Sequence, residues 1–392
     1  MTAPFNIMCF SWNASGLRLC ETMSQSKADA ARKGFKAFIT RKQSCLAPDF
    51  FEEIRGTIHL RQPSIVVMTT QDESNNDTYF HSNLLPSSMP EIGYSFLKRD
   101  KLSGIGEDAS GVPFTRVPSG NPSGSALRIS IYVKSDIVNE FRSDESLLSN
   151  FFSNNGQTEA TCNQGSKTSG AIASYIWHDT YGKFAFVALH LPAGMSSLRV
   201  GKDLDYLTYR AASKATNSLC LLKLYNQLIS SLSPESRPDH IFLLGDFNYD
   251  IVIPGKKNIE IISELAANVS AAKLKDLQRY DELKRAMEDV PLLGFKEGVS
   301  AEGPLFLPTW RLARGRSDDC VPGPTTTSIS PSCFGDPGEL GSIGWHDRIL
   351  YKELMTSNYI AHCTDYNRID VKNMHASIHA GVIGFFEMRP IR

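Results

Sequence analysis

Polar side chains that could bind a cation or move a proton end four apolar, strand-like stretches of the chain. IFLLGDFNYD ends with Asp246 and Asn248, IMCFSWN with Asn13, FAFVALH with His190, and IVVMTTQDE with Gln71, Asp72 and Glu73. In α/β folds, ligands bind just outside strand ends, where side chains from separate loops converge. The four ends therefore predict one shared site.

The residue types at these ends favour a hard cation. Asp246 and Asn248 are two residues apart, so their side chains point the same way if the strand geometry continues through them. Carboxylate and amide oxygens suit Mg²⁺, which keeps several waters and binds through one or two carboxylates. Each residue also has a structural interpretation: Asp-x-Asn after a strand is often a turn or helix cap, Asn13 can start a turn, and His190 can be a hydrogen-bonded core residue. The set as a whole favours a site.

The composition is that of an ordinary soluble globular protein. Of 392 residues, 41% are hydrophobic and 21% are charged, and 41 Lys and Arg nearly balance 42 Asp and Glu. Because no global charge points to a nucleic-acid duplex, we expect no nucleic-acid partner. Neither a signal peptide nor an apolar run of membrane-spanning length is expected.

The cysteines and the glycosylation patterns favour a cytoplasmic location. Eight cysteines are scattered without a CxxC pair or a zinc-ligand spacing, which predicts reduced thiols. Asn13, Asn76 and Asn268 each begin an Asn-x-Ser/Thr pattern. A glycan on Asn13 would block the expected site, so these patterns are not expected to be used.

Strands and helices alternate along the chain. Short runs rich in Val, Ile, Phe and Tyr predict strands over 5–12, 64–69, 126–133, 170–177, 183–190, 240–245, 347–351 and 378–388, and helical patterns cover 26–44, 204–231 and 271–289. This alternation predicts sheets covered by helices. Polar stretches near 101–125, 143–169 and 314–344 are expected to be loop insertions in a single domain over residues 1–392, because helical and strand patterns resume after each.

Several segments together resemble the inositol polyphosphate 5-phosphatase family. GWHDRILYK, residues 344–352, resembles the family's WCDRIL signature, and IFLLGDFNYD resembles its GDLNYRI. SWN is similar to TWN, TTQD to QE, VALHLPAG to NSHLAAG, GKDLDY to RNxDY, and the segment ending in PTWR to one ending in PTYK. The matches keep the family's order from residue 11 to residue 383.

The resemblance implies a fold and a reaction. The fold is a four-layer α/β sandwich of the DNase-I-like type, with two mixed β-sheets packed face to face and helices outside, as in the endonuclease/exonuclease/phosphatase superfamily. The reaction is Mg²⁺-dependent hydrolysis of the 5-phosphate of an inositol polyphosphate or phosphoinositide, by in-line attack of water. The metal and polarised donors would stabilise charge on the transferring phosphoryl group.

The family pattern also implies a role for each matching residue. Asn13 and Asp72 would bind the metal, and Asp246 would accept the proton of the attacking water. Asn248 would orient water and phosphate, His190 would donate to a phosphoryl oxygen, and Asp347 would hold His379 as an imidazolium facing the phosphate. Implied substrate-binding residues are Lys202, Asp203, Tyr206, Trp310, Arg311 and Arg348; for Arg348, a salt bridge inside the sandwich is an equally open interpretation.

Two departures from the family pattern concern catalysis. SIHAGV stands where the family carries SDHKPV, so Ile378 replaces an acid, and an aliphatic side chain can neither bind a cation nor accept a hydrogen bond. Asp72 replaces a longer Glu, unless Glu73 takes its place. A catalytically impaired binding or scaffold protein is therefore a second hypothesis. A nuclease of the same superfamily is a third, opposed by the near-neutral charge and by the PTW and WHDR segments.

Further departures concern the ligand. The family members that prefer a 4-phosphate carry Lys-x-Arg where this chain has Glu339, Leu340 and Gly341, so weak recognition of that group is expected unless Arg314 or Arg316 compensates. His346 replaces the family's Cys and is expected to be a neutral, packed histidine without an assigned role.

Contact with a membrane surface is a further expectation. FLKRDK, residues 96–101, and a basic segment holding Lys27, Arg32, Lys33, Lys36, Arg41 and Lys42 are compatible with either a solvated face or a lipid-binding patch. The expected location is thus cytoplasmic, with peripheral contact at membranes. The sequence gives no prediction of oligomeric state.

Overall fold

The computed structural model describes most of the strands and part of the helices. The described residues are 4–14, 46–74, 81, 84–103, 125–143, 170–191, 217–226, 228–229, 232–289, 294–313, 320, 328–335, 343–354, 357–369, 374 and 377–391. Within these ranges, no helix combines the length and the apolar character that crossing a membrane requires.

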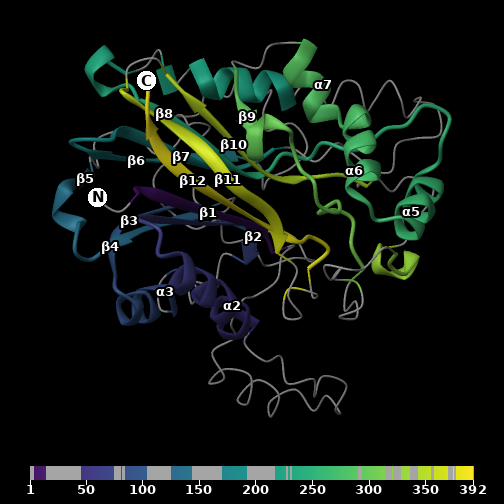
Figure 1. Cartoon of the computed structure of the whole chain (residues 1–392), viewed down its shortest axis with the longest axis horizontal. Coiled ribbons are helices and arrows are strands. Elements are labelled where there is room, and N and C mark those ends of the chain that lie inside the picture. The colour runs from purple at the N-terminus through teal and green to yellow at the C-terminus, as the bar shows by residue number, and fades with distance from the viewer. Residues whose placement is uncertain are drawn as a thin grey trace, which may run out of the picture.

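Two six-stranded mixed sheets form the centre of the molecule (Figure 1). The first has the order β11-β12-β1-β2-β4-β3, with bounds Tyr359–Ile369, Gly381–Pro390, Asn6–Asn13, Ile65–Ser74, Ser125–Lys134 and Tyr94–Ser103. The second has the order β5-β6-β7-β8-β10-β9, with bounds Phe141–Ser143, Gly170–His178, Gly182–His190, His240–Asp246, Asp347–Glu353 and Lys296–Glu297. In each sheet one central pair is parallel, β1 with β2 and β7 with β8.

Alternation along the central strands builds both faces of the sandwich. In β1, Ile7 and Cys9 join the core between the sheets, whereas Met8, Phe10 and Trp12 face the opposite side. Both sets are fully buried because successive side chains of a strand point to opposite faces and both faces are covered.

Helices cover the outer face of each sheet. On the first sheet, the core includes residues of α2 (Leu46–Arg61) and α3 (Leu85–Ser88). On the second, it includes the helical segment 217–226 and α7 (Glu282–Asp289). α5 (Asn258–Ala267) and α6 (Ala271–Leu277) pack their apolar residues at one end of the core between the sheets. The arrangement is the expected four-layer α/β sandwich, with α2 and α3 below the sheets and α7 above them in Figure 1.

Strand register places polar residues from three strands in one row. On β7, β8 and β10, His190 pairs with Asp246, and Asp246 pairs with Asp347. In the first sheet, Asn13 ends β1 opposite Gln71 of β2. The polar residues predicted at strand ends are therefore register partners within each sheet: His190, Asp246 and Asp347 in one, and Asn13 and Gln71 in the other.

The helical pattern over 271–289 is interrupted in the structure. α6 is followed by a 3₁₀ turn at Gln278–Tyr280, and the chain is extended at Asp281 before α7 begins. Asp281 forms a β-bridge with Ile251 and an ion pair with Arg348. The single helix expected here is therefore wrong, because Asp281 leaves the helical path to make these contacts. The segment 26–44 lies outside the described residues.

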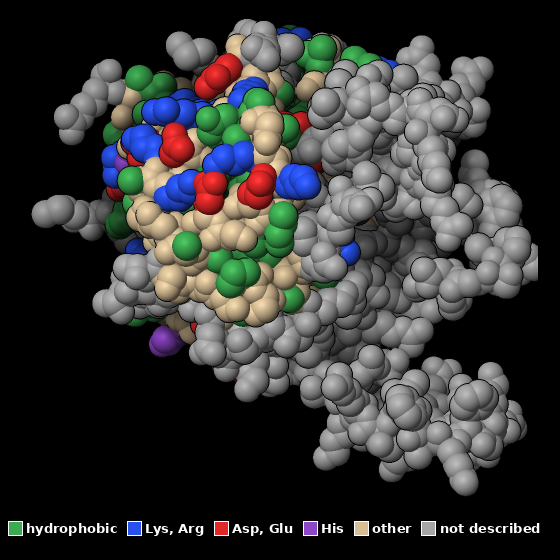
Figure 2. Space-filling view, turned by 90° about the vertical axis from the view of Figure 1, so that its right-hand side faces the viewer, with side chains coloured by type: hydrophobic (Ala, Val, Ile, Leu, Met, Phe, Trp, Pro, Cys, Tyr) green, Lys and Arg blue, Asp and Glu red, His purple; other side chains and the backbone are tan. Residues whose placement is uncertain are grey.

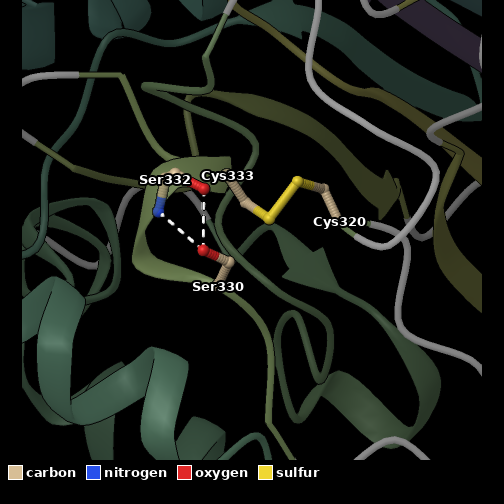
Figure 3. Close-up of a disulfide and its surroundings, with 4 residues drawn as sticks. All are labelled: Cys320, Ser330, Ser332 and Cys333. Carbon is tan, nitrogen blue, oxygen red and sulfur yellow. Dashed lines mark hydrogen bonds between the residues drawn. A yellow bond between two sulfur atoms is a disulfide. The ribbon is translucent and has the colours of Figure 1, made fainter.

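The expectation of eight reduced cysteines is also wrong. Cys320 and Cys333 form a disulfide with Cα atoms 5.3 Å apart (Figure 3), and Cys220 is disulfide-bonded too. The backbone near this bridge is joined to the segment after Trp310, because Ala313 N donates to Cys333 O at 2.9 Å. Spacing alone gave no sign of the pair, since the fold brings the two residues together. Cys9 and Cys363 are free thiols and are buried.

Candidate active site

The carboxylate of Asp246 is the centre of the site. It is 1% exposed and lies at the end of β8. Asn13 Nδ2 donates to its Oδ2 at 2.8 Å, and the backbone N of Asn248 donates to its Oδ1 at 2.8 Å. One bond comes from the other sheet, so Asp246 ties the two sheets together at the strand ends.

The Gly-Asp-Phe-Asn sequence makes this position possible. A Cβ on Gly245 would lie 1.8 Å from the backbone O of Leu189, so only glycine lets β8 approach β7 here. Asn248 has φ of 53°, a left-handed conformation that Asn tolerates better than most residues, and its Nδ2 donates to Leu191 O at 2.7 Å. The strand geometry therefore ends at Asp246, so the condition under which the two side chains would point the same way is not met, because Asn248 turns the chain.

Three imidazoles surround Asp246. His190 Nε2 lies 3.6 Å and His379 Nε2 3.9 Å from Oδ2, and His346 Nδ1 lies 3.9 Å from Oδ1. All three histidines are buried, with at most 7% of their surface exposed. The sequence predicted two of them; His346 was expected only to pack.

The pKa values of the two central carboxyls are displaced in opposite directions. Burial alone would raise the pKa of Asp246, but His379, His190 and His346, together with the Asn13 hydrogen bond, hold it below its ordinary value. Burial raises the pKa of Asp347 above its ordinary value, against the opposing effect of His379 and with the help of the negative charge on Asp246. Asp246 is consequently ionised at neutral pH.

His379 is held on two sides. Its Nδ1 lies 2.8 Å from Asp347 Oδ2, and its backbone N donates to Ser377 Oγ at 3.0 Å. Ser377 Oγ in turn donates to the backbone O of Asn13 at 2.8 Å. Thr309 Oγ1 accepts a hydrogen bond from the backbone N of Asp347 at 3.0 Å. The pairing of Asp347 with His379 agrees with the geometry that the resemblance implied.

The donors near Asn13 are of the kind that a hard cation takes. Asn13 is 2% exposed, and because its Nδ2 is directed to Asp246, its amide oxygen lies on the other side of the group. Among the described residues, Asp347 Oδ1 and Gln71 Oε1 are buried without a hydrogen-bond partner. Amide and carboxylate oxygens of this kind fit Mg²⁺.

Asp72 lies in β2 at an irregularity in the pairing of that strand. The register between β2 and β4 shifts between Thr70 and Glu73, which a β-bulge produces. The side chains of Asp72 and Glu73 lie outside the described residues, so the choice between them stays a prediction. In the part of the chain that is described, no group of three or more His, Cys, Asp and Glu side chains is arranged to hold a metal ion.

Trp310 forms one wall of the site. Its ring packs against two of the histidines, with centroids 5.1 Å from His346 and 4.6 Å from His379. The guanidinium of Arg311 lies 6.0 Å from the centroid of the same ring. An aromatic residue and a cation are thus present where substrate binding was expected.

Arg348 is enclosed in an ion-pair cluster and faces no ligand. Its guanidinium, 1% exposed, donates to Asp281 Oδ2 at 2.8 Å and to both carboxylate oxygens of Glu297. Tyr366 Oη donates to Glu297 Oε1 at 2.8 Å. Of the two interpretations left open, the salt bridge inside the sandwich is the one that this geometry supports, because a fully paired, buried guanidinium is not available to a substrate.

Other expected residues are not placed. Lys202, Asp203 and Tyr206 lie outside the described residues, as do Arg314, Arg316 and the 339–341 segment. Ile378 is partly buried, and its backbone O accepts a hydrogen bond from Leu312 N at 2.9 Å.

The segment FLKRDK is part of a strand. Residues 96–101 belong to β3 at the edge of its sheet, where Phe96 is 48% exposed but Lys98 only 8%. Arg99 donates to His81 O at 2.8 Å. On the side of the molecule seen in Figure 2, Lys and Arg side chains are interspersed with Asp and Glu. Among the described residues, Lys273 pairs with Glu264, and Lys275 pairs with Glu302.

Comparison with known proteins identifies a family and several relatives of the chain. Residues 131–384 match the model of the family described as Endonuclease/Exonuclease/phosphatase family 2. Phosphatidylinositol 3,4,5-trisphosphate 5-phosphatase 1 of Xenopus laevis is 27% identical over 222 residues, 56% of this chain and 18% of that protein. The 5-phosphatase 2B of Danio rerio, named for the same lipid, is 29% identical over 171 residues, 43% of this chain and 12% of that protein. The chain spans less than a fifth of the length of these relatives.

Two solved structures share the fold over nearly the whole chain. The inositol polyphosphate 5-phosphatase domain of SPsynaptojanin, in complex with inositol (1,4)-bisphosphate and calcium ion, has a TM-score of 0.52 at 15% identity and covers 98% of this chain and 85% of its own. A Cimex nitrophorin mutant in its ferrous NO complex has a TM-score of 0.53 at 16% identity and covers 99% of both chains. At such identities the similarity concerns the fold alone. The family match extends over more than half of the sequence and the resemblance to the inositol polyphosphate 5-phosphatases is confirmed, so the chain belongs to Endonuclease/Exonuclease/phosphatase family 2.

Proposed function

We propose that the protein is a Mg²⁺-dependent phosphomonoester hydrolase that removes the 5-phosphate of an inositol polyphosphate or a phosphoinositide. The observation that carries this proposal is the surroundings of Asp246. One buried carboxylate receives hydrogen bonds from Asn13 and Asn248 and is faced by three imidazoles drawn from distant parts of the chain. A purely structural role requires no such convergence of proton carriers.

In the proposed reaction Asp246 is the proton acceptor. Water donates a hydrogen bond to this carboxylate, and the proton passes to it as the water oxygen bonds to phosphorus. The P–O bond to the inositol ring breaks, and the leaving oxygen takes up a proton from solvent. The lowered pKa keeps Asp246 ionised before the reaction, and Asn13 and Asn248 fix its two oxygens.

His190 and His379 would act on the phosphoryl oxygens. Both present Nε2 toward the space beside Asp246, and Asp347 accepts from Nδ1 of His379, which is the arrangement that suits an imidazolium. Donors fixed in this way stabilise charge as it develops on the phosphoryl group. Trp310 and Arg311 would contact the ring or a second phosphate.

Asn13 and Asp72 are the residues that would hold the metal. A bound Mg²⁺ would neutralise negative charge on the phosphoryl oxygens. The amide and carboxylate donors of the site suit this ion.

A second candidate function is binding without hydrolysis. Ile378 motivates it, because the position that carries an acid in the resembled family is aliphatic here and the acid's hydrogen bonds are lost. The fold does not decide between the two, since a Cimex nitrophorin has the same sandwich.

Release of inorganic phosphate tests the proposal. We expect release from soluble or lipid inositides that carry a 5-phosphate, none from isomers that lack it, and loss of release when EDTA removes Mg²⁺. Asp246→Asn removes the proton acceptor, so we expect kcat to fall by about 10³-fold or more, and His379→Gln by about 10²-fold.

The matched control is His178→Gln. His178 is also buried and its Nε2 lies 3.0 Å from a carboxylate, that of Glu140, but it lies at the other end of β6 from the site. This variant should keep the activity of the unmodified protein. If the unmodified protein releases no phosphate but binds inositides saturably, the second candidate function, binding without hydrolysis, is favoured. Nicking of plasmid DNA would favour a nuclease.

A further inference from the structure

His346 lies beside Asp246, although no role was predicted for it. It is 4% exposed, and its Nε2 lies 2.7 Å from Asp250 Oδ1. Within the described part of the chain its Nδ1 has no hydrogen-bond partner, yet it lies 3.9 Å from Asp246 Oδ1. Leaving a buried polar atom unpaired costs about 1–3 kcal/mol. A small molecule that forms hydrogen bonds with both His346 Nδ1 and Asp246 Oδ1 would remove this cost.

The ring of His346 is fixed in its orientation by three neighbours. Asp250 forms a hydrogen bond with Nε2 of the ring. The backbone of Asp250 is fixed by Glu282: Asp250 N donates to Glu282 Oε2 at 3.1 Å, and Glu282 N donates to Asp250 O at 3.0 Å. Trp310 stacks on the ring with 17° between the planes. On the remaining side, a Cβ on Gly344 would lie 3.0 Å from Cδ2 of His346 and 2.5 Å from Tyr249 O, so glycine is needed there.

Two His–Asp pairs consequently face one carboxylate. His379 with Asp347 approaches Oδ2 of Asp246, and His346 with Asp250 approaches Oδ1, in each case with the ring nitrogen 3.9 Å away. Trp310 contacts both histidine rings, whose centroids are 6.2 Å apart. Only the first pair was expected from the family pattern.

The partner of Nε2 decides what Nδ1 can do. A carboxylate accepts hydrogen bonds, so in the neutral form of His346 Asp250 places the ring proton on Nε2 and leaves a lone pair on Nδ1. Nδ1 and Asp246 Oδ1 are then two acceptors separated by a distance that one water molecule bridges with hydrogen bonds of roughly 2.8 Å each.

We propose that His346 is a further catalytic residue, which together with Asp246 Oδ1 forms a two-acceptor seat for the attacking water. This inference rests on the proposed function. One O–H of the water donates to Asp246 and loses its proton there as the oxygen bonds to phosphorus. The other O–H donates to His346 Nδ1 and stays intact, so a lone pair of the oxygen faces the phosphorus. The inositol oxygen leaves and is protonated by solvent, as above.

The kinetic test removes the acceptor and keeps the packing. His346→Phe retains a ring against Trp310, so we expect kcat to fall about 10- to 100-fold because the water loses its orientation, with KM changed by less than about twofold because ground-state binding is kept. His346→Ala should show a similar loss that added imidazole partly restores. Asp250→Asn, which can reverse the ring tautomer, should lower kcat as well.

His178→Phe is the control for loss of a buried histidine, and the thermal midpoint of each variant shows whether it folds. A merely structural His346 would give a lower midpoint with kcat per folded molecule unchanged and no rescue by imidazole. That result would overturn the proposal, as would equal losses for His178→Phe and His346→Phe.

A second measurement does not depend on activity. In a high-resolution crystal structure we expect a water within hydrogen-bond distance of both Asp246 Oδ1 and His346 Nδ1, absent in His346→Phe. If the unmodified protein releases no phosphate but this water is present, the proposed function fails and the seat stands. If phosphate is released but no water lies between the two atoms, the seat fails and the proposed function stands.

Discussion

Asp246 receives hydrogen bonds from Asn13, 233 positions away in the sequence, and from Asn248, two positions away. The short-range bond is a turn contact of the kind that Asp and Asn commonly make after a strand. The long-range bond joins the two sheets. The turn interpretation of Asn248 is therefore right, and the catalytic interpretation of Asp246 stays a prediction, although the carboxylate that makes the turn contact also faces the histidines. A turn residue and a catalytic residue can be one side chain.

Gly245 controls how closely β7 and β8 approach beside these residues. A methyl group there would lie 1.8 Å from Leu189 O, so Gly245→Ala must push the two parallel strands apart next to His190 and Asp246. We expect a loss of roughly 1–3 kcal/mol in the free energy of unfolding, measured by urea denaturation. The rate of phosphate release per folded molecule should also fall, since His190 and Asp246 are displaced relative to each other.

Gly56→Ala is the matched substitution for Gly245→Ala. Gly56 is exposed in α2, and nothing lies within 4 Å of an added Cβ, so alanine should stabilise the helix by up to about 1 kcal/mol. Equal effects of the two substitutions would contradict the close approach of β7 and β8.

At the scale of elements, eight strands were predicted within a few residues of their observed bounds, because they are apolar on one or both faces. β3 and β11 were missed for a physical reason. β3 is an edge strand with the charged sequence KRDK, and β11, also at an edge, alternates buried residues with polar ones such as His362 and Asn367. Edge strands carry charge to prevent pairing with other chains, so they lack the apolar signal.

Arg348 joins four elements at one point. It lies on β10 and binds Asp281 ahead of α7 and Glu297 of β9, and Glu297 also accepts from Tyr366 of β11. Removing one partner of a buried ion pair leaves unpaired charge in the core. We expect Arg348→Met to lower the free energy of unfolding by about 3–5 kcal/mol, measured by chemical denaturation with inositide binding assayed on the folded fraction.

The comparison for this variant is Arg142→Met. Arg142 pairs with Asp179 at 3.1 Å, with the two side chains 66% and 69% exposed, so its loss should change stability by less than about 1 kcal/mol. Should Arg348→Met fold as stably as the unmodified protein while binding substrate more weakly, the guanidinium would have to contact the ligand after all.

For the whole molecule, the sequence predicted several residues that the fold brings together in the candidate site, but not all of them. Asn13, His190, Asp246 and Asn248 were found because polar residues at the ends of apolar strands contrast with their surroundings. The positions of His346 and Thr309 in the site, and the burial of Arg348, follow from which strands are neighbours. No local sequence pattern contains that information. The Cys320–Cys333 pair was missed for the same reason, since its two halves meet only through the fold.

Two buried histidines outside the site make global stability depend on pH. Both ring nitrogens of His81 form hydrogen bonds, Nε2 with Thr70 Oγ1 at 2.8 Å and Nδ1 with Ser130 Oγ at 2.7 Å. Nε2 of His240 forms a hydrogen bond with Tyr181 O at 3.1 Å. Burial lowers the pKa of His81 well below the ordinary value, and Arg128 and Arg99 add to the effect. Burial also lowers the pKa of His240, against a smaller opposing effect of Tyr181 O.

The unfolded chain therefore binds protons below about pH 6.5 that the folded chain does not bind. Because the unfolded state gains protons first, stability is full above this pH and is lost as pH falls toward the folded pKa values, by up to about 1.4 kcal/mol per pH unit for each histidine. We expect His81→Gln to be less stable than the unmodified protein at pH 7.5 but to lose less stability between pH 7 and about 5.5, measured as thermal midpoints in matched buffers. His59→Gln, at an exposed position of α2, should leave the slope unchanged. If His81→Gln keeps the full slope, His81 is protonated in the folded state, and its burial between Thr70 and Ser130 is not what limits stability in acid.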